Sequence, residues 1–133
     1  MALNNPYAAY QQNSINMKSP GELTLMLYDG CLKFMKLAKQ AIEQGDLEMK
    51  NTNLVKAQNI IQELNVTLNR EVELAGSMGA MYEYIYRRLI EANINNDKDI
   101  VTEVEGYVKD FRDAWKQAIQ IERQGRFGTG GHV

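Results

Sequence analysis

Histidine and cysteine are the side chains best suited to act as bases, nucleophiles or transition-metal ligands at neutral pH, and the chain has one of each. A Ser-His-Asp or Cys-His mechanism requires an imidazole held about 3 Å from its nucleophile. His132 lies in the glycine-rich ending GRFGTGGHV, where no neighbouring sequence would hold it in place. Cys31 falls among apolar residues at helical spacing, which is typical of a small buried hydrophobe. We expect no catalytic residue.

The sequence also lacks the pattern of a metal centre. Helical bundles hold di-metal sites with Glu-x-x-His pairs from two helices, and a single histidine cannot supply two such pairs. Carboxylates at helical spacing, such as Asp99 with Glu103, alternate with lysines as on a solvated helix face. We expect no metal and no cofactor. A metal-dependent bundle oxidase or hydrolase is the enzyme alternative, and elemental analysis of the purified protein would test it.

Composition narrows the class of protein and of partner. With 133 residues, 44% hydrophobic and 24% charged, the chain fits one globular domain. A net charge of −2 argues against nucleic acid as the main partner. A single cysteine allows no internal disulfide, as in a reducing cytoplasm. Because no signal peptide or run of about 18 apolar residues occurs, we expect a cytoplasmic protein without membrane insertion.

Helices must position any site that the chain contains. Both prolines, Pro6 and Pro20, lie near the N-terminus, so the rest of the chain lacks the residue that most strongly interrupts a helix. Ser19, Pro20 and Glu22 form a capping-box helix start, after which apolar residues recur at three- and four-residue steps.

These patterns give the element boundaries and the fold class. We expect helices over 20–44 and about 47–73, a shorter one carrying Met81 to Ala92 after a break near 75–79, and a fourth ending near Gln124. The apolar stripes of the last three helices should face the core, and they include Leu47, Tyr82, Phe111, Trp115 and Ala118. Long helices with short links predict an all-α, antiparallel, up-and-down four-helix bundle. Its domain is expected over residues 19–124, with a flexible N-terminal arm at 1–18 and a loose glycine-rich tail at 125–133.

A second row of residues on the predicted 47–73 helix is uncharged through much of its length. Solvent-facing helices usually carry Lys and Glu at such positions. Amides donate and accept hydrogen bonds at once, so they suit a peptide's polar groups, while valines can receive its apolar side chains. An ordinary neutral surface is the alternative. The candidate partner-binding residues in this row are Val55, Gln62, Asn65, Val66 and Asn69.

Two further features suggest a partner surface. The 20–44 helix is apolar over a wider face than a small bundle normally hides, and we expect residues such as Met35 and Leu37 to be surplus to the core. Arg87 and Arg88 form the only adjacent arginine pair. Each could bind an internal Glu, which we favour, or an external carboxylate.

Several short motifs follow one another along the chain. They are an arm with spaced tyrosines, Ser19-Pro20-Gly21-Glu22-Leu23, Leu27-Tyr28-Asp29-Gly30-Cys31-Leu32, the run from Lys56 to Leu64, Tyr86-Arg87-Arg88-Leu89, Ala92-Asn93 and Glu103-Val104. In their order and spacing, from about Tyr7 to Trp115, these motifs resemble the flagellar secretion chaperone family FliS, also known as flagellin-specific export chaperones.

This resemblance implies a four-helix bundle without catalytic activity that binds flagellin. The disordered C-terminal segment of flagellin would wrap around the bundle, and flagellin would stay unpolymerised in the cytoplasm. The loaded complex would then deliver flagellin to the type III export apparatus, where it would meet the export-gate membrane protein. Tyr7 and Tyr10 match arm positions that, in some relatives, cover the binding surface until flagellin displaces them. The alternatives are a regulatory adaptor that sequesters another disordered protein, such as an anti-sigma factor, and a homo-oligomeric structural bundle.

Overall fold

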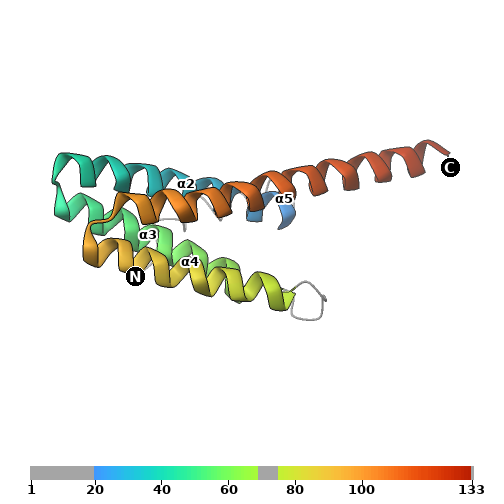
Figure 1. Ribbon diagram of the computed structural model, residues 1–133. Helices are drawn as coiled ribbons and strands as arrows, with labels where there is room; N and C mark the ends of the chain where they lie inside the picture. The colour runs from blue at the N-terminus through green and yellow to red at the C-terminus, as the bar shows by residue number, and fades with distance from the viewer. Residues whose placement is uncertain (1–19, 69–74, 133) are drawn as a thin grey trace, which may run out of the picture.

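In a computed structural model of the protein, the described part of the chain forms four helices (Figure 1). The structure describes residues 20–68 and 75–132, and for residues 20, 75 and 125–132 it describes the backbone alone. The helices are α2 (Pro20–Gln44), α3 (Leu47–Val66), α4 (Ala75–Asn95) and α5 (Lys98–His132). The predicted all-α four-helix bundle is confirmed, and the expected arm at 1–18, with Ser19 of the capping box, lies outside the described residues.

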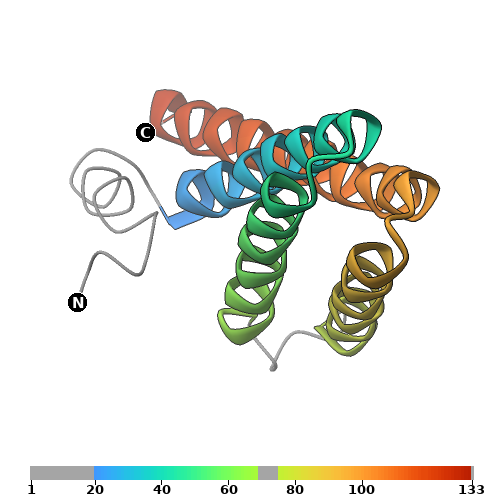
Figure 2. The same ribbon diagram turned by 90° about the vertical axis from the view of Figure 1, so that its left-hand side faces the viewer.

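The helices follow one another around the bundle in chain order (Figure 2). Each packs against its neighbours in the sequence, and α5 closes the ring by packing against α2. Gly30 of α2 lies against α3, where a Cβ would come into van der Waals contact with Ile60 Cδ1 at 3.4 Å. Because neighbours in the chain are also neighbours in the bundle, α4 has α3 on one flank and α5 on the other.

Two tight turns at the same end of the bundle reverse the chain. Gly45 takes a positive φ of 73° after α2, and Asp46 caps α3 by accepting a hydrogen bond from the Met49 N–H at 3.0 Å. Asn96 takes a φ of 52° after α4, and Asp97 accepts hydrogen bonds from N–H groups in the first turn of α5. These short links explain why consecutive helices run antiparallel.

The core is continuous along the bundle and draws on all four helices. Apolar side chains at three- and four-residue steps meet on the inner faces, as the sequence pattern predicted. The largest fully buried side chains are Tyr28, Met35, Leu54, Ile60, Ile61, Ile85, Leu89, Val101, Val104, Val108 and Cys31.

The bounds of three helices differ from those predicted. Helix α3 ends at Val66, before the expected residue 73, because the Thr67 hydroxyl bonds to the carbonyls of Glu63 and Leu64 and the chain turns there. Helix α4 begins at Ala75, within the expected break. Its glycines are weak helix formers, but Met78 packs against the core, and tertiary packing outweighs propensity.

Helix α5 extends past the expected end near Gln124 and projects beyond the other helices in Figure 1. The stretch contains no proline, so nothing blocks the addition of further turns, although each glycine costs about 1 kcal/mol relative to alanine. The predicted end of this helix near Gln124 is therefore wrong, because the helical backbone continues to His132. The looseness of 125–133 stays a prediction.

Two apolar residues lie where the sequence pattern did not place them. Leu47 was expected in the core but is 58% exposed, because it begins α3 at the end of the bundle. Met35 was expected to be surplus to the core but is fully buried. Helix α2 packs against both α3 and α5, so it buries a wider face than a helix with one neighbour.

Candidate partner-binding site

A shallow groove runs between α3 and α4. Its cavity has a volume of about 250 Å³ and is lined by Ile61, Gln62, Asn65, Tyr82, Glu83, Tyr86 and Arg87. Ile61 and Tyr82 are buried and form an apolar floor, whereas Gln62, Glu83 and Arg87 are exposed at the rim. We call this hollow the α3–α4 groove. It offers amides and both signs of charge around a strip that can take an apolar side chain.

A larger hollow lies on the other flank of α4. It has a volume of about 420 Å³ and is lined by Tyr28, Ser77, Met78, Met81, Phe111, Ala114, Trp115 and Ala118. We call it the apolar cavity, since most of the side chains that line it are apolar. Its methionine side chains adapt easily to the shape of a guest. Phe111 and Trp115 are only half-buried, so part of each ring faces the solvent.

A cluster of three aromatic rings, of which the two tyrosines are buried, separates the two hollows. Tyr28 lines the apolar cavity and Tyr82 lines the α3–α4 groove, and their hydroxyls form a hydrogen bond of 2.5 Å. The Phe111 ring lies 6.5 Å from that of Tyr28 and 5.9 Å from that of Tyr82, between ring centroids. Burial, and for Tyr28 also the hydrogen bond to Tyr82, raises the pKa of both hydroxyls.

The start of α2 is fastened to α5 beside the apolar cavity. The Trp115 indole Nε1–H donates a hydrogen bond of 2.8 Å to the carbonyl of Gly21, so one edge of the ring is fixed while its face borders the cavity. Arg123 forms an ion pair with Glu22, and Arg112 lies 3.5 Å from Asp29. These contacts hold the α5 wall of the cavity against α2.

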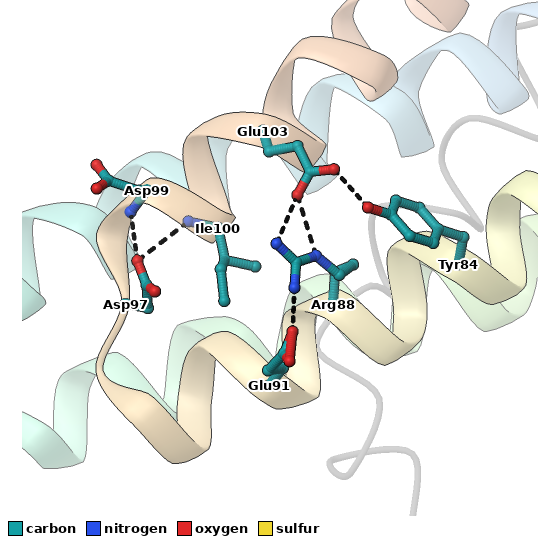
Figure 3. Close-up of polar contacts among 7 residues, drawn as sticks. All are labelled: Tyr84, Arg88, Glu91, Asp97, Asp99, Ile100 and Glu103. Atoms are coloured by element: carbon teal, nitrogen blue, oxygen red, sulfur yellow. Dashed lines mark hydrogen bonds and ion pairs between the residues drawn. The ribbon is translucent and has the colours of Figure 1, made fainter.

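A polar network fixes α4 to α5 on the outer surface. Figure 3 shows the Arg88 guanidinium reaching Glu103 on α5 and Glu91 on its own helix. Its Nη2 lies 2.9 Å from Glu103 Oε1, and the Tyr84 hydroxyl donates to Glu103 Oε2 at 2.5 Å. The Tyr84 hydroxyl first and then Arg88 hold the pKa of Glu103 below its usual range. Arg88 therefore has internal partners, as we favoured from the sequence.

The C-terminal end of α4 is pinned to α3 by a buried lysine. The Lys50 ammonium donates to the Asn93 carbonyl at 2.7 Å and to the Asn96 side chain, and the Asn93 amide donates to Asn51 Oδ1 at 2.8 Å. The lysine thus satisfies the Asn93 carbonyl in the last turn of α4, where main-chain carbonyls lack a helical partner. These contacts fix α4 against α3, and the Glu103 network fixes it against α5.

The structure places the predicted residues unevenly. Gln62 and Asn65 line the α3–α4 groove. Val55 and Val66 are exposed on α3, Val66 to 81%, but they lie outside the lining of both hollows. Tyr7, Tyr10 and Asn69 lie outside the described residues, so their predicted contacts stay predictions.

The apolar cavity has no counterpart among the surfaces predicted from the sequence. Phe111, Trp115 and Ala118 were assigned to the core stripe of the last helix, yet they line the cavity, and Ala118 is exposed. The cavity draws side chains from α2, α4 and α5, so no single helix pattern reveals it. The sequence does contain one sign of the cavity. The apolar stripe of the last helix continues through Phe111, Trp115 and Ala118, which line the cavity instead of lying fully in the core.

Among the described residues, Cys31 is the side chain best suited to act as a nucleophile, and it is buried in the core. Burial raises the pKa of the Cys31 thiol, and its Sγ lies 3.8 Å from the Ala57 carbonyl inside the core. In ranges 20–68 and 75–132, no cluster of three His, Cys, Asp or Glu side chains could hold a metal ion. None of the helices in that part of the chain has the length and apolar character needed to cross a bilayer.

Comparison with known proteins assigns the chain to a family. The model of the family described as "Flagellar protein FliS" matches residues 3–122. The chain belongs to the FliS family. It is similar to the flagellar secretion chaperone FliS of Bacillus subtilis (strain 168), with 71% identity over 131 residues and 98% of each chain covered.

More distant FliS proteins are also similar over most of their length. The flagellar secretion chaperone FliS of Salmonella typhimurium is 38% identical over 109 residues, which cover 80% of this chain and 81% of that protein. The FliS of Escherichia coli (strain K12) is 35% identical over 111 residues, which cover 81% and 82%. The resemblance stated from the sequence motifs is therefore confirmed. Both hollows lie inside the part of the chain that matches the FliS family.

Proposed function

We propose that this protein is a cytoplasmic export chaperone that binds the disordered C-terminal segment of flagellin, keeps it from polymerising early and hands it to the flagellar type III export apparatus. The protein acts by binding and needs no catalytic group. The export-gate membrane protein would be a second partner, met once flagellin is loaded.

The apolar cavity is the observation that carries this proposal. A bundle with a complete core has no need of a half-open apolar hollow of about 420 Å³. Exposed apolar surface with a polar rim is typical of a surface that binds a partner. In a member of a family named for flagellar secretion, an export substrate is the partner that fits.

The two hollows suit a client that folds on binding. A disordered segment can bury about 1,000 to 3,000 Å² while it loses several kcal/mol to its own ordering. Because the hollows on both flanks of α4 are rigid, the protein itself loses little conformational entropy when the client binds. We propose Gln62 and Asn65 as groove contacts, and Val55, Val66 and Asn69 as contacts where the client crosses α3. Tyr7 and Tyr10 would compete for the same surface from the arm.

Calorimetry and circular dichroism with a synthetic C-terminal segment of flagellin test the proposal. We expect saturable binding with a gain of helical signal beyond the sum of the two components. Ala118→Glu places a carboxylate in the wall of the apolar cavity at an exposed position, so it should weaken binding at least tenfold without unfolding the bundle. Its matched control is Gln117→Glu, an exposed neighbour outside the lining.

Two results would contradict the proposal. One is no heat and no gain of helix with the unmodified protein. The other is equal affinity of the Ala118→Glu and Gln117→Glu variants for the flagellin segment, which would show that the client avoids the apolar cavity.

A further inference from the structure

We infer that the α3–α4 groove recognises the order of charges in the segment it binds, with a carboxylate of the segment beside Arg87 and a basic group beside Glu83. The inference rests on the proposed function and adds to it the chemistry of one client contact. It concerns Glu83 and Arg87, which belong neither to the bundle core nor to the polar network shown in Figure 3.

Adjacent arginines have different surroundings. Arg88 is bound to Glu103 and Glu91 between α4 and α5. Arg87 points to the other flank of α4, where it is exposed and lines the α3–α4 groove. Among residues 20–68 and 75–132, Arg87 forms no ion pair or hydrogen bond to a side chain. The external carboxylate that the sequence left open for this pair therefore applies to Arg87 alone.

Glu83 is the other charge in the groove, one helical turn before Arg87. Residues four apart on a helix share a face and often pair with each other. In the described part of the chain Glu83 forms no ion pair, with Arg87 or any other residue. The rest of the lining is uncharged, since α3 contributes Ile61, Gln62 and Asn65 and α4 contributes two tyrosines. Both charges thus face a ligand that enters the groove.

The spacing of the two charges fixes the spacing that the partner must offer. Four residues of helix rise about 6 Å. An acid and a base one turn apart on a client helix match this distance, as do residues two apart in an extended segment at about 6.6 to 6.8 Å. The arrangement fits a peptide with opposite charges about 6 Å apart, and a client with two acidic groups there would meet Glu83 unfavourably.

A charge exchange in the groove tests this inference without changing composition or net charge. The variant Glu83→Arg/Arg87→Glu reverses the polarity of the groove at two exposed positions. The matched control, Lys109→Asp/Asp110→Lys, exchanges two exposed charges on α5 outside both hollows. Circular dichroism and the thermal midpoint check that each variant is folded, and Arg87→Gln serves as a milder single change.

The dissociation constant for the flagellin C-terminal segment is then measured at low and high salt. We expect the groove exchange to weaken binding about tenfold at low salt, with a smaller loss at high salt, because two attractions become two repulsions that salt screens. The α5 exchange should leave affinity unchanged. A peptide whose own acid and base are exchanged should bind the exchanged groove more tightly than it binds the unmodified protein.

Equal affinity of the groove exchange and the unmodified protein would overturn the inference and leave the proposed function standing. Failure of the unmodified protein to bind the flagellin segment would overturn both. Equal losses from the groove and α5 exchanges would show a general charge effect and also contradict recognition by the groove.

Discussion

The hydroxyls of Tyr28 and Tyr82 satisfy each other where the bundle excludes water. Their rings are 1% and 2% exposed, so neither hydroxyl could exchange its partner for solvent. The sequence predicted Tyr82 on a core stripe, but it could not reveal the partner, which lies 54 residues away. Pairing across that distance depends on the register of α2 against α4, and no local pattern records it.

Single and double substitutions of these tyrosines test their pairing. Tyr28→Phe or Tyr82→Phe leaves one buried hydroxyl without a partner and should lower the free energy of unfolding by about 1 to 3 kcal/mol. The double variant should lose clearly less than the sum of the two, because no unpaired group is left behind. Urea unfolding measures all four proteins. Additive losses would show that the two hydroxyls act independently.

Buried acidic groups also predict how stability changes with pH. Burial raises the pKa of the Cys31 thiol, and that of both tyrosines, so these groups keep their protons in the folded state after the unfolded chain has lost them. The unfolded state then binds fewer protons, and the free energy of unfolding falls as pH rises. The decline should begin above about 8.5, the ordinary pKa of cysteine, and steepen above about 10, that of tyrosine.

Cys31→Ala separates the two parts of this pH dependence. The variant should lose the decline between about pH 8.5 and 10 and keep the one above it. Its lower stability at neutral pH does not matter, since the comparison is between slopes. Urea unfolding at several pH values measures both proteins, and the same slope in the two would contradict the assignment to the thiol.

At the scale of the element, apolar periodicity predicted the interior of each helix but not its ends. The expected start of α2 at Pro20 agrees with the structure, because a Pro at the first helical position is a local signal. The end of α3 and the start of α4 depend on competing hydrogen bonds of Thr67 and on packing of Met78. Such events are set by tertiary surroundings, so the spacing of apolar residues does not report them.

The aspartate caps predict a measurable contribution to helix stability. Asp46 accepts a hydrogen bond at the start of α3 and Asp97 does so at the start of α5. Either one replaced by Ala should lower the free energy of unfolding by about 1 kcal/mol, and replacement by Asn should cost much less because Asn caps equally well. Chemical unfolding of the four variants tests this. Equal losses for Ala and Asn would point to charge in place of capping.

At the scale of the whole molecule, α4 separates two hollows of different chemistry. The α3–α4 groove is rimmed by amides and charges, whereas the cavity between α4 and α5 is mainly apolar. The sequence predicted part of the groove, because Gln62 and Asn65 lie in one uncharged row on one helix. It did not predict the apolar cavity, since that hollow exists only once three helices are assembled.

The fastening of α4 explains why both hollows can persist without a client. Lys50 holds its C-terminal end to α3, and Glu103 holds its outer face to α5. Neither contact lies in the lining of a hollow. A client that enters both would therefore bind a scaffold whose walls are already in place, which lowers the ordering cost of association.

Trp115 offers the most direct test that the bundle lends its apolar cavity to flagellin. It is the only tryptophan in the chain, it is half-buried, and it lines the cavity. Titration with a flagellin C-terminal segment that lacks tryptophan should shift its fluorescence emission to shorter wavelength and saturate at the stoichiometry found by calorimetry, and Ala118→Glu should weaken the response. Emission that stays unchanged while calorimetry shows full binding would contradict the claim.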